Sequence, residues 1–367
     1  MIWLTVNPFR NDGDSNVTSM SGKSSAHAPR SRPTMRHVAA LAGVGIKTVS
    51  RVINQEPNVS AATIAKVMDA ARSLDYHPDE QAGNLRRADG RTRTLGLLVS
   101  SVDNPFAGAM HRAIEDLALE RGIAVFASSL DDDAEREQSS VAAFLRRRVD
   151  GLILTTISRD QSYLASEMRH GTPIVFVDRE PAGITGDCVM SDNRAGATTA
   201  TNHLLDHGHR RIAYLGDRSD IYTAAQRRAG FFDALGRAGI PTGDIPVIEN
   251  LHDERSAAQA MLALLDSATP PSAVFTSQNL VTIGAIRALR SREAHRRTAL
   301  VGFDDFQLSD LLDPGVTVVA QDPEEIGRTA AQRLIGRLDG EATPARTCIV
   351  PTTLIVRGSG EIRSVQP

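Results

Sequence analysis

One segment near the amino end constrains the fold of this chain most, because its pattern predicts short helices joined by a tight turn. In TMRHVAALAGVGIKTVSRVIN, Thr34 stands where an N-cap is expected, Gly43 ends a first helix and Gly45 begins a second. A third helix is expected after Ser60. The residues expected to be buried are Met35, Val38, Leu41 and Ala42 in the first helix, Val49, Val52 and Ile53 in the second, and Ile64, Val67, Met68, Ala71 and Leu74 in the third. Three such helices can enclose one small core.

The second of these helices has polar and basic side chains on the face away from its apolar stripe. Lys47 and Arg51 are four residues apart, so they project together and can reach guanine edges or phosphates of DNA. Thr48, Ser50 and Asn54 suit phosphate contacts. The alternative interpretation is a small helical bundle with ordinary surface charges. A phosphate-cradling loop at GVGIKT does not fit, because the segment follows a helix and lacks the GxxxxGK[ST] spacing.

The distribution of charge also favours an anionic partner for this part of the chain. The 367 residues have a net charge of −3, but residues 30–93 hold eleven Lys and Arg against six Asp and Glu. That stretch is therefore +5 and the remainder is −8. An apolar fraction of 41% over this length is enough for two or three folding units.

Cysteine usage and hydropathy indicate a cytoplasmic protein. Cys188 and Cys348 are far apart and show no CxxC spacing, so neither a disulfide framework nor a thiolate metal site is expected. No stretch resembles a signal peptide or a membrane span. Residues 1–33, rich in Ser, Asn, Asp and Pro, are expected to be a disordered extension, and residues 361–367 a tail.

From residue 94 onward, short apolar runs alternate with amphipathic stretches. The apolar runs begin at Leu95, Ile123, Gly151, Pro173, Arg211, Ser272 and Ala299. Helix-like segments such as 107–121, 135–147 and 224–238 lie between them. This is a repeated βαβ pattern, which predicts parallel sheets flanked by helices, and its length suggests two α/β lobes. Ligands of such sheets bind beyond the carboxyl ends of the strands, where the sequence has Asp103, Asp131, Asp178 and Asp304.

These motifs together resemble the lactose/galactose repressor (LacI/GalR) family. AGVGIKTVSRVIN is similar to the family's helix-turn-helix signature, and the resemblance extends over residues 34–358. It implies a homodimeric transcription repressor, not an enzyme, in which each subunit reads half of a near-palindromic operator in the major groove. Ile46, Lys47 and Arg51 fall on the family's base-reading positions, and Ile46 suits a thymine methyl. Gly45 replaces the usual Ser N-cap and, like Thr34, is among the implied DNA-binding residues.

The resemblance also implies a hinge helix that folds on DNA. Leu85 in AGNLRR falls on the family's hinge leucine, beside Arg86. An apolar wedge at this place unstacks a base step in the minor groove, while arginines neutralise nearby phosphates. The alternative is that Leu85 is a linker residue. The implied boundaries are a helix-turn-helix DNA-binding domain at 34–79 and a hinge helix with linker at 80–93.

The remainder resembles the family's regulatory domain, which is two-lobed like the periplasmic sugar-binding proteins. SSVDNPFAGAM, IVFVDRE, HLLDHGHRRIAYLG and LVGFDDF are among the matching landmarks. The implied effector-binding and dimerisation domain is 94–360, with one lobe of about 94–190 and 321–348 and the other of about 191–320 and 349–360. The implied effector-binding residues are Asn104, Phe106, Asp131, Asp178, Thr223, Arg227, Gln278, Asp304 and Gln321.

Carboxylates and an arginine that converge on a cleft suit polyhydroxylated or anionic ligands. A sugar or sugar derivative is therefore the expected effector, and no cofactor is expected. The alternative for each residue is a strand-end side chain that satisfies nearby backbone groups. Gln278 and Asn279 depart from the family's usual Asn-Asp pair, so no particular sugar follows. The sequence leaves open induction or corepression, and repressor or activator. It predicts a dimer, because no leucine heptad follows the last strand.

Two clusters resemble metal sites but favour other interpretations. His203, His207 and His209 include an i, i+4 pair, yet Gly208 indicates a helix end before a strand, which suits a structural turn. The consecutive acids 131–133 point in different directions, which predicts a solvated turn. The competing class is a sugar-binding protein or Rossmann-type enzyme with a helical appendage, but neither a nucleophile elbow nor a GxGxxG after a strand supports it.

Overall fold

The computed structural model describes residues 32–54, 56–77 and 90–364. The chain divides after Arg86 into two units, each with its own core. The predicted hinge residues Leu85 and Arg86, and nearly all of the predicted amino-terminal extension, lie outside the described residues. Within the described ranges, none of the helices is both long and apolar enough to span a membrane.

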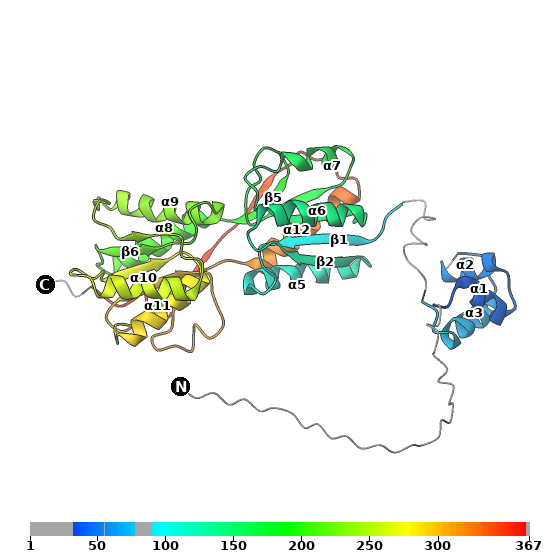
Figure 1. The fold of residues 1–367 in the computed structure, drawn as a ribbon, viewed down its shortest axis with the longest axis horizontal. Coiled ribbons are helices and arrows are strands. Elements are labelled where there is room, and N and C mark those ends of the chain that lie inside the picture. Colours follow the sequence, from blue (N-terminus) through cyan, green and yellow to red (C-terminus); the bar gives the residue numbers. More distant parts are fainter. Residues whose placement is uncertain (1–31, 55, 78–89, 365–367) are drawn as a thin grey trace, which may run out of the picture. The chain divides into compact units, whose positions relative to one another are not determined.

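The amino-terminal unit consists of three helices (Figure 1), which are α1 (Met35–Ala42), α2 (Ile46–Ile53) and α3 (Ala61–Ser73). Thr34, Gly45 and Ser60 are their N-caps, as predicted. The turn after α1 depends on Gly43, whose φ of 65° is in the left-handed region that glycine adopts without steric cost. The short α1–α2 connection is therefore a helix-turn-helix turn.

The core of this unit is narrower than the sequence pattern predicted. Its buried apolar residues are Val38, Ala39, Val49, Val52, Val67, Ala70 and Ala71. Leu41, Ile64 and Met68 were also expected inside, but they are 56%, 41% and 42% exposed. The reason is the small size of the unit: α3 has only two eight-residue helices to contact, so a narrow stripe of its surface is covered.

One lobe of the second unit, the N-lobe, is a six-stranded parallel sheet in the order β11-β5-β4-β3-β1-β2. Its strands are β1 (Thr94–Val99), β2 (Ala124–Ser129), β3 (Gly151–Thr155), β4 (Ile174–Val177), β5 (Asp187–Ser191) and β11 (Thr347–Val350). Its helices are α5 (Pro105–Glu120), α6 (Ala134–Arg146), α7 (Ala165–Arg169), preceded by the 3₁₀ turn η1 (Ser162–Leu164), and α12 (Pro323–Leu338). The pair α5 and α12 covers one face and α6 lies on the other (Figure 1).

The other lobe, the C-lobe, repeats this arrangement in the order β12-β10-β9-β8-β6-β7, with only β12 antiparallel. Its strands are β6 (Ile212–Leu215), β7 (Val247–Ile248), β8 (Ala273–Thr276), β9 (Ala299–Phe303), β10 (Thr317–Ala320) and β12 (Thr353–Ile355). Its helices are α8 (Asn193–Asp206), α9 (Tyr222–Arg237), α10 (Glu254–Leu265) and α11 (Asn279–Ser291). The pair α8 and α9 packs on one face and α10 and α11 on the other.

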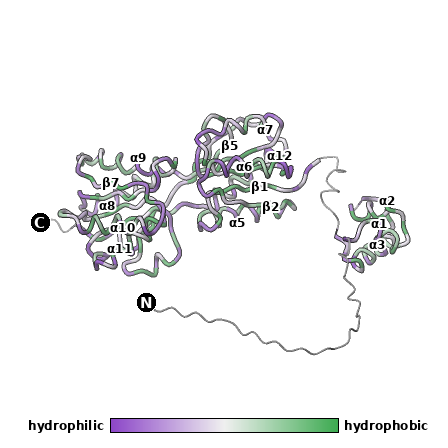
Figure 2. The backbone as a smooth tube through the Cα atoms, viewed as in Figure 1, coloured by the Kyte–Doolittle hydropathy of each residue, from purple (hydrophilic) through white to green (hydrophobic). Residues whose placement is uncertain are grey.

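The two-lobed α/β prediction is confirmed by this architecture. All seven predicted apolar runs form strands, namely β1, β2, β3, β4, β6, β8 and β9. Hydrophobic stretches concentrate in the helices and strands of both lobes (Figure 2), as parallel sheets covered on both faces require. The chain passes between the lobes three times, from β5 to α8, from β10 to α12 and from β11 to β12.

Candidate functional site

The carboxyl ends of strands from both lobes enclose a cavity of about 420 Å³. The loops after β1, β2 and β4 line it from the N-lobe, and those after β6, β7, β8, β9 and β10 line it from the C-lobe. All nine residues predicted from the sequence as effector ligands line this one cavity. Sequence reasoning missed other lining residues, among them Ser101, Asp132, Arg179, Asp217, Ile221 and His252.

Arg227 is the most firmly held side chain of the cavity. It projects from α9 and is 5% exposed. Its Nε donates to Asn193 Oδ1 at 2.7 Å, and its Nη1 donates to the Ser277 carbonyl at 2.7 Å. Nη1 also lies 3.4 Å from Asp304 Oδ2, and the guanidinium sits 3.9 Å from the centre of the Phe303 ring. These contacts fix one cation in place before any ligand arrives.

Asp304 connects this cation to the segment that joins the lobes. The residue follows β9 with φ at 70°, and its N–H donates to the Val319 carbonyl at 2.9 Å. Gln321 Nε2 donates to Asp304 Oδ1 at 2.6 Å, while Gln321 Oε1 is buried and has no hydrogen-bond partner among the described residues. Because a buried acceptor without a donor is costly, a ligand hydroxyl at this point would be favourable. Gln321 lies at the β10–α12 crossing between the lobes.

Asp178 has the same place in the N-lobe that Asp304 has in the C-lobe, at the carboxyl end of a strand. It follows β4 with φ at 67°, and its carboxylate lies 3.6 Å from Arg179 Nε. Burial raises the pKa of Asp178, and the nearby carboxylates of Asp304 and Asp132 raise it further, although Arg179 and Arg227 oppose them. The cavity therefore holds several acids whose charges are only partly balanced.

In the loop after β2, the prediction of a solvated turn at residues 131–133 is wrong for one of the three acids. Asp132 was expected in a solvated turn, but its side chain is only 12% exposed and lies 2.8 Å from Arg179 Nη2. The two neighbours behave differently: Asp131 pairs with Arg136, and Asp133 caps α6 by accepting from the Glu135 N–H at 2.8 Å. A positive φ at both Asp131 and Asp132 turns the loop, so the middle acid points inward.

Some predicted ligands also satisfy local backbone groups, which was the alternative interpretation. Asn104 Oδ1 caps α5 by accepting from the Phe106 N–H at 3.0 Å. The side-chain oxygens of Gln278 and Asn279 both accept from the Leu280 N–H, each at 2.8 Å. Their amide groups therefore keep N–H donors for other partners, whereas their acceptors cap α11.

The second candidate surface is the exposed face of α2. Ile46 is 45% exposed, and Lys47, Arg51 and Asn54 are exposed as well, while Thr48 and Ser50 are half-buried. Arg51 has local partners, since its Nη2 donates to the Pro57 carbonyl at 3.2 Å and its Nε lies 3.4 Å from Glu56 Oε2. Asn54 Nδ2 donates to Ser50 Oγ at 3.4 Å.

Two histidines of the cluster contact the carboxyl-terminal segment of the chain. His203 pairs with Glu361, and His209 Nε2 donates to the Ile362 carbonyl at 2.7 Å. His209 Nδ1 lies 2.9 Å from Ser272 Oγ. These contacts hold the carboxyl-terminal segment against α8, which is the structural use that the sequence favoured. No group of metal-ligating side chains was found within the described ranges.

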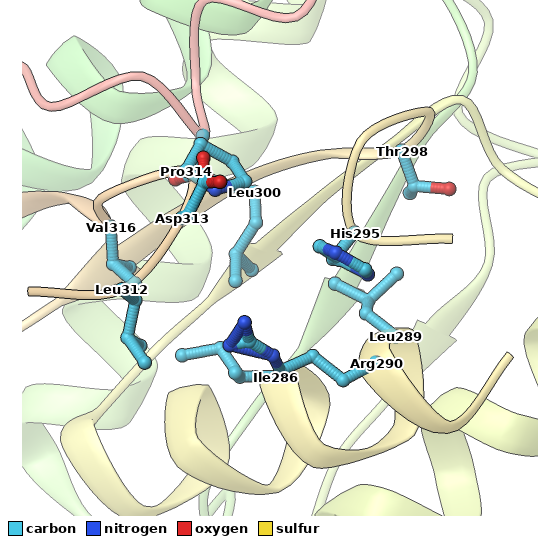
Figure 3. A pocket seen from close by; sticks show the side chains of 11 residues that line it. Ile286, Leu289, Arg290, His295, Thr298, Leu300, Leu312, Asp313, Pro314 and Val316 are labelled. Atoms are coloured by element: carbon cyan, nitrogen blue, oxygen red, sulfur yellow. The ribbon is translucent and has the colours of Figure 1, made fainter. Parts of the chain in front are cut away.

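A second, much smaller hollow lies beside α11 (Figure 3). Its volume is about 20 Å³, and it is lined mostly by apolar side chains such as Leu289, Leu300 and Val316. Space of this size holds about one water molecule. Leu300 and Val316 lie near the amino ends of β9 and β10, so the hollow is at the edge opposite the large cavity.

Comparison with known proteins identifies the family. Residues 34–79 match the family described as bacterial regulatory proteins, lacI family, and residues 201–360 match the periplasmic binding protein-like domain. The HTH-type transcriptional regulator GalR of Escherichia coli (strain K12) is 33% identical over 335 residues, which cover 91% of this chain and 97% of GalR. The chain belongs to the LacI family. It is a DNA-binding transcription regulator with a periplasmic-binding-protein-like effector domain, and regulators of this family are not enzymes.

Two solved structures resemble this LacI-family regulator over most of its length. The lac repressor dimer bound to operator and the anti-inducer ONPF is 28% identical, with a TM-score of 0.80 over 90% of this chain and 99% of the repressor chain. The transcriptional regulator CelR in complex with cellobiose is 32% identical, with a TM-score of 0.66 over 89% of this chain and 100% of CelR. The family and fold predicted from the sequence are therefore confirmed.

Proposed function

We propose that this LacI-family regulator is a cytoplasmic, homodimeric repressor that binds a near-palindromic operator through α2 and is released by a carbohydrate in the inter-lobe cavity. The observation that carries the proposal is the convergence of acids, amides and one anchored arginine from both lobes on a single cavity. The lac repressor is a dimer on its operator, and CelR binds cellobiose, which supports both halves of the proposal.

The DNA-binding half places base contacts on Ile46, Lys47 and Arg51. Their exposure on one helix supports this role. Arg51 must exchange its contacts to Glu56 and Pro57 for contacts to DNA. Lys47→Ala should weaken binding to the preferred operator by about 1–3 kcal/mol and relax specificity at one base pair. Fluorescence anisotropy on a panel of palindromic duplexes measures this, with Lys66→Ala on α3 as the matched charge control.

The charges in the cavity favour an uncharged effector. Six aspartates line it, namely Asp103, Asp131, Asp132, Asp178, Asp217 and Asp304. The cations that line it, Arg179, Arg227 and His252, already have carboxylate partners. A phosphate or carboxylate on the ligand would meet uncompensated like charge, whereas hydroxyl groups can donate to the acids and to Gln321 Oε1. This supports a neutral sugar over a sugar phosphate or a sugar acid.

Thermal shift and anisotropy test this half together. Neutral sugars such as ribose and cellobiose are compared with ribose 5-phosphate and gluconate, because a ligand of the folded state raises Tm. The sugar that binds should then weaken operator affinity by a coupling of about 1–3 kcal/mol. Tighter operator binding would make the protein a corepressor-dependent regulator. Binding confined to the anionic compounds would contradict the assignment of a neutral effector.

A further inference from the structure

The edge of the N-lobe opposite the cavity has an excess of basic residues. Strands β1, β2, β3 and β4 are parallel, so the segments that lead into them meet at this amino edge. These segments contain Arg91, Arg93, Arg121, Arg146, Arg147, Arg148 and Arg169. The acids in or beside them are Glu120, Asp150, Glu167 and Asp339.

Most of these arginines are not neutralised by the acids. Asp339 pairs with Arg91 and Arg121. Asp150 accepts from the backbone N–H groups of Thr92 and Arg93, both at 2.7 Å, so it is used to hold the start of β1. That leaves Arg93, Arg146, Arg147, Arg148 and Arg169, which we name the basic edge. All five are exposed, and within the described ranges none of their guanidinium groups has a carboxylate within 4.0 Å.

The two edges of the N-lobe therefore differ in sign. Asp103, Asp131, Asp132 and Asp178 lie at the carboxyl edge, in the cavity. Residue 90 leads into the start of β1, so the segment that joins the two units reaches the second unit at the basic edge. Thirteen chain steps separate residue 77 from residue 90, and a fully extended chain of that length spans at most about 47 Å.

We propose that the basic edge is a second DNA-contacting surface, which binds phosphates of the duplex held by α2 and reads no bases. Exposed guanidinium groups without carboxylate partners suit phosphate oxygens, and the tether supplies a polyanion at high local concentration. The function proposed above uses α2 and the hinge for DNA, so this surface would add affinity for any sequence. Its contribution should appear in the salt dependence of binding, because each neutralised phosphate releases counterions.

The experiment compares two triple variants of the full chain that remove the same charge. R146Q/R147Q/R148Q removes part of the basic edge, and R237Q/R255Q/R297Q removes three exposed C-lobe arginines. Anisotropy measures affinity for an operator and for a scrambled duplex from 50 to 200 mM salt. The edge variant should lose affinity equally for both duplexes, and its plot of log K against log salt should flatten by roughly 1–3 units, at about 0.9 per lost phosphate contact.

The control variant should match the wild type, and R146K/R147K/R148K should keep the wild-type slope because it keeps the charge. An unchanged slope in the glutamine variant overturns the proposal, as does a loss confined to the operator, which would mean base reading. If the glutamine variant melts early, R93Q/R169Q applies the same test to the rest of the basic edge. All edge variants could keep the wild-type affinity and salt slope while Lys47→Ala still loses operator affinity. That result would overturn the basic-edge proposal and leave the proposed α2 interface intact.

Discussion

The Nε2 atom of His252 lies 3.9 Å from Oδ2 of Asp132, so a C-lobe imidazole meets an N-lobe carboxylate across the cavity. The other ring nitrogen, Nδ1, is 2.9 Å from Asp217 Oδ1. The hydrogen bond to Asp217 raises the pKa of His252, and the charges of Asp217 and Asp132 raise it further, although partial burial opposes them. When protonated, this ring joins an acid of each lobe.

This arrangement predicts a pH-dependent contact between the lobes. Because the folded-state pKa of His252 is raised, its stabilisation is fully present below the unfolded value near 6.5 and is lost as pH rises through the folded value. The side chain is 52% exposed, so solvent screening keeps the effect small. Scanning fluorimetry should show that the Tm of the wild type exceeds the Tm of His252→Gln by more at pH 6 than at pH 8. Parallel pH profiles would contradict the prediction.

Asp304 is predicted to be essential for effector affinity. Asp304→Asn removes the charge beside the buried Arg227 and weakens the acceptor that faces the ligand, while its amide can still accept from Gln321. Effector Kd should rise at least tenfold, which is about 1.4 kcal/mol. Titration calorimetry with the sugar found by thermal shift measures it. Asp233→Asn, which removes one charge from an ion pair on α9, is the control and should bind normally.

The buried His209 should make the stability of the protein fall at acidic pH. Burial lowers the pKa of His209, because a charged ring would be desolvated among Ser272, Ile362 and their neighbours. The unfolded chain therefore takes up the proton first, and stability is lost as pH falls through about 6.5. Urea unfolding should show a lower free energy of unfolding at pH 5.5 than at pH 7.5. His209→Gln should be less stable throughout by about 1–3 kcal/mol and show a weaker pH dependence.

Two glycines on α9 should respond in opposite ways when each is replaced by alanine, as measured by the free energy of unfolding. A Cβ at Gly230 would lie 2.1 Å from the Arg194 carbonyl oxygen, where α8 and α9 cross. A Cβ at Gly236 would meet nothing within 4 Å. Gly230→Ala should lower the free energy of unfolding by about 1–3 kcal/mol or more, because backbone must move. Gly236→Ala should raise it by about 0.5–1 kcal/mol, because alanine favours the helix. Equal effects in chemical denaturation would refute the packing argument.

Strand ends could be predicted from the sequence because they depend on local pattern. A run such as IVFVD gives both the strand β4 and the acid that follows it, so Asp178 and Asp304 could be placed at the carboxyl edges. Residues recruited from loops could not be placed this way. Asp131 and Asp132 look alike in the sequence, and only the turn geometry decides that Asp132 is largely buried against Arg179 while Asp131 is more exposed. His252 follows a two-residue strand that gives no periodic signal.

Strands with weak or polar patterns were also missed. β5 begins with Asp187, whose charge is held by Arg333 and Arg337 from α12. An acid at the start of a strand is unfavourable by propensity, and it is tolerated here because partners nearly 150 residues away in the chain neutralise it. Such compensation is a property of the tertiary structure, which no local window contains.

The three passages of the chain between the lobes limit what movement is available to them. Two bodies joined by one strand can separate or twist freely, but three neighbouring connections leave mainly a rotation that opens or closes the cavity. A ligand that contacts both lobes would then act mainly on the angle between them. Gln321 lies on one of these connections and donates to Asp304 in the cavity, so one residue belongs both to the cavity wall and to the connection between the lobes. A small displacement there is geometrically amplified at the far edges of both lobes.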